Sequence, residues 1–161
     1  MANSDTGLKA LDRIDRRILK EMQNNSRISY VDLGKIVGLS TSPCLERVKR
    51  LEKGGYIIDY SASLNPELLG AGLLVFVEIS LKYKTENVFD DFKKAVGQWP
   101  QIQECHLVSG NYDYLLKVRI KNIAAYRQLL GDIMHTLPDV RDSKTMVVME
   151  TACESGKIYL G

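Results

Sequence analysis

Two short segments of the sequence combine residue types that could bind a nucleic acid or a small polar ligand. The first, residues 40–50, begins with hydroxyl groups and a proline and continues with charged side chains. Such groups near the start of a helix can reach base edges and phosphates in the major groove of DNA. The candidate DNA contacts are Ser40, Thr41, Ser42, Pro43, Glu46, Arg47, Lys49 and Arg50.

The helical pattern of this segment is compatible with two interpretations. Leu45, Val48 and Leu51 form an apolar row, which leaves the charged side chains to face outward. They could contact DNA, or they could solvate a surface helix in ion pairs with Glu46 and Glu52. The elements on either side, described below, favour DNA binding.

The second segment is the polar and aromatic stretch 109–114. Gly110 allows close approach to the backbone, so exposed amides there could hold a carboxylate, and Asp113 could accept hydrogen bonds from an ammonium group. A zwitterion such as an amino acid needs both partners. The alternative is a hairpin turn, for which Gly-Asn with an aspartate nearby is ordinary, and the residues alone favour this turn.

Residues for catalysis or metal binding are few. The two histidines, His106 and His135, belong to different predicted elements, and the sequence contains no Ser-His-Asp arrangement, HExxH motif, phosphate loop or metal-spaced cluster. We therefore expect no enzyme activity, no metal and no cofactor. The three cysteines are far apart, which predicts reduced thiols rather than the alternative of a redox sensor.

The first third of the chain predicts three helices. Leu11, Ile14, Ile18 and Met22 recur at helical spacing, and a second helix ends at Gly38. The third helix begins at residues 40–43 and runs to the glycine pair 54–55, and a strand is expected over residues 56–64. This pattern predicts a helix-turn-helix followed by a wing, in a domain at 1–62 with a linker at 63–72.

The remainder contains two similar halves. Strands are predicted at 73–81, 102–108, 112–120 and 140–150, and helices at 86–98 and 123–136. The order is βαββαβ, the ferredoxin-like arrangement, in a domain at 73–161. The expected fold class is therefore α+β.

The first and last of these strands are apolar on both faces. Because both helices should lie on one face of the sheet, the other face would be uncovered and apolar, which predicts self-association. The alternative is that the tail, residues 151–161, folds over that face.

Composition excludes a membrane protein and is compatible with a DNA-binding one. The chain has 161 residues, of which 45% are hydrophobic, and no run approaches the ~18 apolar residues of a membrane span. The start lacks a signal-peptide pattern, so a cytoplasmic location is expected. Net charge is only +2, but Lys and Arg outnumber Asp and Glu 11 to 8 in residues 1–62 and are outnumbered 11 to 12 afterwards.

Several sequence stretches, in order, match one known family. They are LDRID at 11–15, VGLS at 37–40, PCLERV at 43–48, LVFVEI at 74–79, IQECHLVSG at 102–110, DYLLK at 113–117 and VVME at 147–150. On these stretches the chain closely resembles the Lrp/AsnC, or feast/famine, transcription regulators over nearly its whole length.

The resemblance implies a winged helix-turn-helix joined to an effector-binding domain that forms dimers, which assemble into octamer-like particles around which DNA wraps. It implies an amino-acid effector, leucine or a related one, bound between dimers near the loop at 110–114, and a nucleoid-associated protein. It therefore reverses the preference for a plain turn. The implied effector residues are Leu107, Gly110, Asn111, Tyr112, Asp113, Tyr114, Met146, Val147 and Val148.

Two rival functions remain open at this stage. Relatives with the same architecture resemble sirohaem decarboxylases, so a tetrapyrrole enzyme is one alternative. A DNA-compacting protein without an effector is the other.

Overall fold

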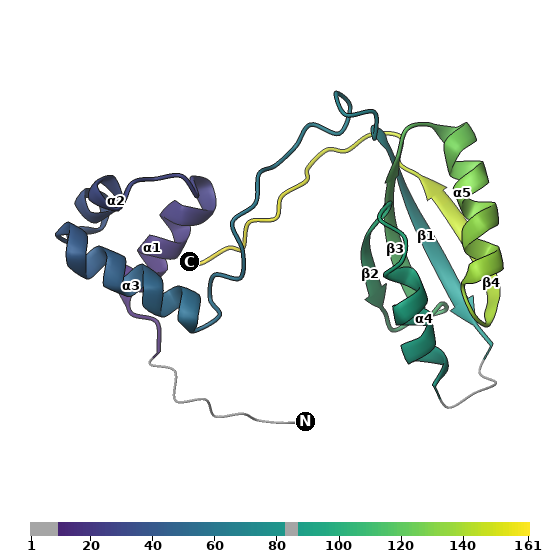
Figure 1. Ribbon diagram of the computed structural model, residues 1–161, viewed down its shortest axis with the longest axis horizontal. Helices are drawn as coiled ribbons and strands as arrows, with labels where there is room; N and C mark the ends of the chain where they lie inside the picture. The colour runs from purple at the N-terminus through teal and green to yellow at the C-terminus, as the bar shows by residue number, and fades with distance from the viewer. Residues whose placement is uncertain (1–9, 83–86) are drawn as a thin grey trace. The chain divides into compact units, whose positions relative to one another are not determined.

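The computed structural model describes residues 10–82 and 87–161, which form two compact units (Figure 1). The first unit comprises the chain up to Ala62 together with Glu154–Gly161, and the second comprises Ser63–Cys153. Among the described residues, no helix has both the length and the apolar character needed to cross a membrane.

The first unit contains three helices: α1 (Arg13–Asn24), α2 (Tyr30–Val37) and α3 (Thr41–Lys53). Asp12 and Asp15 form a capping box at the start of α1, and the Ser29 hydroxyl accepts a hydrogen bond from the backbone of Asp32 at the start of α2. The buried core is small and drawn from all three helices: Ile18, Met22, Leu33, Val37, Cys44, Val48 and Leu51.

The turn between α2 and α3 depends on two glycines. Gly38 ends α2 with φ +76°, the left-handed conformation that glycine adopts without steric cost. Gly34 is buried, and the Leu39 amide donates to its carbonyl at 2.8 Å, so the turn closes tightly against α2. The predicted helix-turn-helix is therefore present.

The strand expected over residues 56–64 is not formed, so that prediction was wrong. These residues lack strand structure, and the described part of the first unit offers no strand with which they could pair. β propensity alone cannot satisfy backbone hydrogen bonds without a partner strand. A side-chain contact does occur here, because the Tyr60 hydroxyl donates to Glu52 at 2.7 Å.

The end of the chain lies on α1, not on the sheet. The Gln23 side chain donates to the Ile158 carbonyl at 2.9 Å and accepts from the Ile158 amide at 3.0 Å. Lys157 donates to Asn24 at 2.9 Å. We expected the tail within a domain at 73–161, or as a cover for the sheet, but residues 154–161 belong to the first unit.

The second unit confirms the βαββαβ order. Its elements are β1 (Leu73–Leu81), α4 (Val88–Val96), β2 (Ile102–Leu107), β3 (Tyr114–Ile120), α5 (Ile123–Thr136) and β4 (Val140–Val147). The strands form one antiparallel sheet in the order β2-β3-β1-β4. Three strands are shorter than predicted: β2 ends at Leu107, β3 begins at Tyr114 and β4 ends at Val147.

Both helices cover one face of this sheet. Val75, Val77 and Ile79 of β1 face α4 and α5, where Phe92 and Ile133 are buried among them. The opposite face mixes apolar and charged side chains. Phe76 pairs with Met146 and lies beside Lys117, while Glu104 forms an ion pair with Lys117 at 2.9 Å.

Candidate DNA-binding and ligand-binding surfaces

The start of α3 presents exposed polar groups. Ser40 is the N-cap residue, yet its hydroxyl makes no capping hydrogen bond, and Thr41, Ser42 and Pro43 are exposed. Lys49 is also exposed and has no ion pair with any residue that the structure describes. These positions can meet a groove and its phosphates without first breaking a contact inside the protein.

Arg47 and Arg50 differ from the other candidates, because both are engaged with α1. One Arg47 nitrogen donates to Asp15 at 2.8 Å and to Asp12 at 2.5 Å. Arg50 reaches both carboxylate oxygens of Asp15 at 2.6 Å. The Asp15 side chain is only 2% exposed, so these arginines neutralise a buried charge.

The prediction that Arg47 and Arg50 simply face outward therefore needs correction. Each is partly exposed, but each also joins α3 to α1. The pairing lowers the pKa of Asp12 to about 2, chiefly through its hydrogen bond from Arg47 and then through the Asp15 amide. Sequence reasoning missed this role, although an aspartate on the buried face of α1 signals a need for cationic partners.

The loop between β2 and β3 is held to the end of β1 by Asp113. Its carboxylate accepts a hydrogen bond from the Leu81 amide at 2.7 Å, and its own amide donates to the Ile79 carbonyl at 2.9 Å. The Val108 amide donates to the Asp113 carbonyl at 2.9 Å, and Gly110 has φ +144°. Asp113 thus fixes the loop that contains the exposed Gly110 and Asn111.

Tyr114 is a core residue. It is 1% exposed, and its ring stacks on Phe92 with a centroid distance of 4.5 Å. Its hydroxyl donates to the Phe89 carbonyl at 3.5 Å, and burial raises the pKa of the phenol. In a single chain, Tyr114 therefore packs in the core next to the loop and does not line an exposed surface.

The structure does not bring the two groups of predicted effector residues together within one chain. Asp113 contacts β1 at Ile79 and Leu81, whereas the Val148 amide donates to Leu74 at the other end of that strand. Ile79 follows Leu74 by five positions along the strand, a distance of about 16 Å. The remaining predicted residues vary in burial: Leu107, Met146 and Val147 are exposed, and Tyr112 is half-buried.

Nothing in the described residues suggests a metal centre. No three His, Cys, Asp or Glu side chains gather there in a way that could hold an ion. Cys44 is buried and Cys105 partly buried, and desolvation raises the pKa of both thiols, which disfavours the reactive thiolate.

Two family models match the two units. Residues 11–58 match a winged helix-turn-helix DNA-binding model, and residues 74–158 match the Lrp/AsnC ligand-binding domain. The chain belongs to the Lrp/AsnC family. Its relatives include the leucine-responsive regulatory proteins of Escherichia coli K12 and Klebsiella pneumoniae, each 55% identical over 94% of this chain and 93% of the relative.

Solved structures support the same assignment for this Lrp/AsnC protein. A transcriptional regulator of Neisseria meningitidis in complex with L-Met has a TM-score of 0.89 at 32% identity, covering 94% of this chain and 97% of that one. An AsnC family regulator of Agrobacterium tumefaciens has a TM-score of 0.89 at 33% identity, covering 93% and 97%. The chain is therefore a DNA-binding transcription regulator with a ligand-binding domain, and not an enzyme.

Proposed function

We propose that this Lrp/AsnC regulator reads a specific DNA sequence through α3 and responds to an amino acid with an apolar side chain, leucine or methionine. The observation that carries the proposal is the 55% identity to leucine-responsive regulatory proteins over nearly the full length of both chains. A regulator of similar structure is in complex with L-Met, which supports the same class of effector. Such a protein acts on chromosomal DNA in the cytoplasm as part of the nucleoid.

The proposed base contacts come from the start of α3. Ser40, Thr41, Ser42 and Pro43 are exposed there, and Glu46 and Lys49 lie on the outer surface of the helix. Arg47 and Arg50 remain proposed phosphate contacts, because a guanidinium has five N–H donors and Asp15 does not use them all.

We propose that the effector binds between two copies of the chain. The exposed amides at Gly110 and Asn111 would hold its carboxylate, with Tyr112 and Leu107 beside them. Asp113 and Tyr114 would keep this loop in place. Val147 and Val148 lie beside the start of β1, away from Asp113 at its end, so we propose that a second copy supplies the apolar set Met146, Val147 and Val148. Effector binding would then change assembly.

Exposed apolar side chains support self-association into dimers and octamer-like particles that bend or wrap DNA. Leu64, Leu68 and Leu69 of the linker are 64–84% exposed, and Ile58 is 93% exposed. Large apolar side chains this exposed are typical of a protein interface. A closed particle would hold several α3 helices at fixed spacing.

Selection from a random duplex library tests sequence-specific DNA binding. We expect enrichment of one partly palindromic motif, and weaker binding of that motif by the Ser42→Ala and Lys49→Gln variants at fixed salt. Lys53→Gln removes a charge from the end of the same helix and is the matched control. No enriched motif, or unchanged affinity in both variants, would contradict the proposal.

A thermal-shift screen of the twenty amino acids tests the effector. A ligand that binds only the folded protein raises its Tm, so leucine or methionine should give the largest rise. Changing Asn111 and Tyr112 to alanine together should reduce that rise and spare DNA binding. A screen in which no amino acid raises the Tm would instead favour an architectural protein without an effector.

A further inference from the structure

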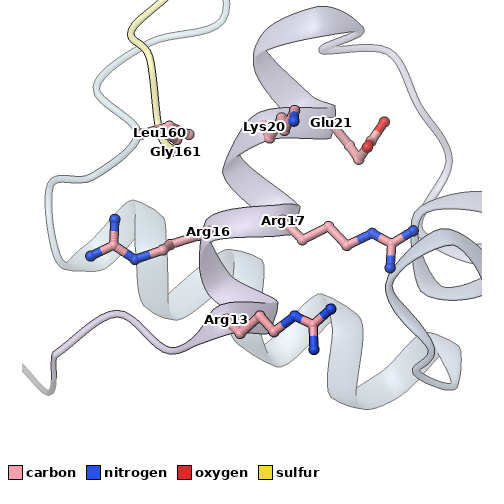
Figure 2. A pocket seen from close by; sticks show the side chains of 7 residues that line it. All are labelled: Arg13, Arg16, Arg17, Lys20, Glu21, Leu160 and Gly161. Atoms are coloured by element: carbon pink, nitrogen blue, oxygen red, sulfur yellow. The ribbon is translucent and has the colours of Figure 1, made fainter.

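The outer surface of α1 has four basic side chains close together, an arrangement that does not stabilise a helix in water. Arg13, Arg16, Arg17 and Lys20 occupy positions i, i+3, i+4 and i+7, so they form one continuous surface opposite the buried residues Ile18 and Met22. We call these four residues the α1 basic row. It lines an open hollow of about 810 Å³ that Glu21, Leu160 and Gly161 complete (Figure 2).

This arrangement is unfavourable for the helix itself. Arg13 and Arg17, and likewise Arg16 and Lys20, are like-charge pairs at i,i+4 spacing, which destabilise a helix. Arg13 and Arg16 also place positive charge in the first turn, where the helix dipole favours anions. Local conflicts of this kind are expected at functional sites, where the bound partner removes the conflict.

The basic row also lacks the acidic partners that several other cations in the described chain have. Lys35 pairs with Asp32, Lys93 with Asp90, and Arg47 with two aspartates. Within the described residues, no ion pair or hydrogen bond is found for the side chains of the basic row.

Among the described residues that line the hollow, Glu21 has the one acidic side chain, against four basic ones. Asp15, on the opposite face of the same helix, is held by Arg47 and Arg50. The hollow therefore keeps an excess of positive charge.

We propose that the α1 basic row binds the phosphate backbone of DNA, as a contact surface separate from α3. A site for one small anion would aim its donors at a single point. In Figure 2 the guanidinium groups of Arg13 and Arg17 instead point away from that of Arg16, so the charges are spread over both sides of the helix. The row is about 10 Å long, which matches several consecutive phosphates and not one.

The position of the row indicates which DNA it contacts. Its residues lie on the side of α1 turned away from the core that α1 shares with α2 and α3. We therefore place its contacts on the DNA backbone, outside the groove that α3 enters. The inference rests on the proposed function only in taking DNA as the partner, since backbone contact needs no sequence recognition.

Salt dependence of binding to a random-sequence duplex of several helical turns tests the inference. Each phosphate that the protein neutralises contributes about −0.9 to the slope of log K against log salt. The Arg16→Gln/Lys20→Gln variant should reduce the magnitude of that slope by about 0.9 for each phosphate that it no longer neutralises. Arg127→Gln/Arg141→Gln removes the same charge from exposed positions of the second unit and should leave the slope unchanged.

Two further variants separate charge from structure. Arg16→Lys/Lys20→Arg keeps both charges and should retain the wild-type slope. Arg16→Gln/Lys20→Gln should have an equal or higher Tm, because it removes a like-charge pair, and Arg13→Gln/Arg17→Gln should repeat both effects independently. The inference would be overturned if Arg16→Gln/Lys20→Gln and Arg13→Gln/Arg17→Gln both had the same slope as the Arg127→Gln/Arg141→Gln control.

Failure of the inference can be told apart from failure of the proposed function. Equal slopes together with an enriched DNA motif would remove the basic row and leave α3 as the DNA reader. A reduced slope without an enriched motif would leave the row as a backbone contact and remove sequence-specific reading.

Discussion

The buried carboxylate of Asp15 joins α1 to α3 in the DNA-binding unit. Arg47 and Arg50 both donate to it, across 32 and 35 residues of sequence. Loss of one donor leaves a buried charge with fewer partners, and this cost is larger than the gain from an exposed ion pair. These arginines therefore affect folding as well as DNA binding.

We predict that Arg50→Met lowers the local unfolding free energy of α1 and α3 by about 2 kcal/mol, because a buried carboxylate loses two charge-assisted hydrogen bonds. Hydrogen exchange of the amides of these helices measures the change, and the amides of the second unit serve as an internal reference. Lys53→Met is the control, since Lys53 is exposed at the end of α3. Equal protection in the two variants would show that the ion pair contributes no stability.

A second prediction concerns the glycine that ends α2. Gly38→Ala should destabilise the first unit by about 1 kcal/mol, because alanine resists the left-handed conformation at φ +76°. A Cβ there would meet nothing within 4 Å, so the cost is conformational and not steric. Gly97→Ala is the matched control: Gly97 also follows a helix, but with φ −62°. Urea denaturation of both variants should therefore show a lower midpoint for Gly38→Ala alone.

At the scale of elements, local signals predicted the helices better than the contacts between them. The glycine Gly38 and the apolar rows depend on neighbours within a few residues, so the end of α2 and the start of α3 at the N-cap position of Ser40 could be placed from the sequence. The strand expected over residues 56–64 failed because pairing needs a distant partner. The Asp15 pairs and the separation of Val148 from Asp113 likewise depend on tertiary structure and strand order.

The cap of α1 makes the first unit sensitive to acid. The pKa of Asp12 is about 2 in the folded protein and 3.8 ordinarily, so its stabilising effect is complete above pH 3.8 and is lost as pH falls toward 2. We predict that Asp12→Asn, which keeps a capping oxygen, flattens the dependence of Tm on pH in this range. Thermal melts of both proteins from about pH 5 to about pH 2 measure the difference. Parallel curves would contradict the assigned role of Asp12.

At the scale of the whole molecule, the described chain leaves apolar surface that its own tail does not cover. Residues 154–161 pack on α1 within the first unit, so they are not available to the outer face of the sheet. On that face Phe76 and Met146 are neighbours, and the ion pair of Lys117 and Glu104 lies on the other side of Phe76. Exposed apolar side chains on the uncovered face of a sheet are typical of a protein interface.

We therefore predict that Met146→Glu weakens self-association, because the new carboxylate would be buried next to Phe76 and its copy in the partner. Sedimentation velocity over a range of concentrations should show a smaller particle for this variant than for the wild-type protein. Ile123→Glu introduces the same charge at an exposed position of α5, on the helix-covered side of the sheet, and should sediment as the wild type does. The opposite result, dissociation by Ile123→Glu alone, would place the interface on the helices and leave the outer sheet face without a partner.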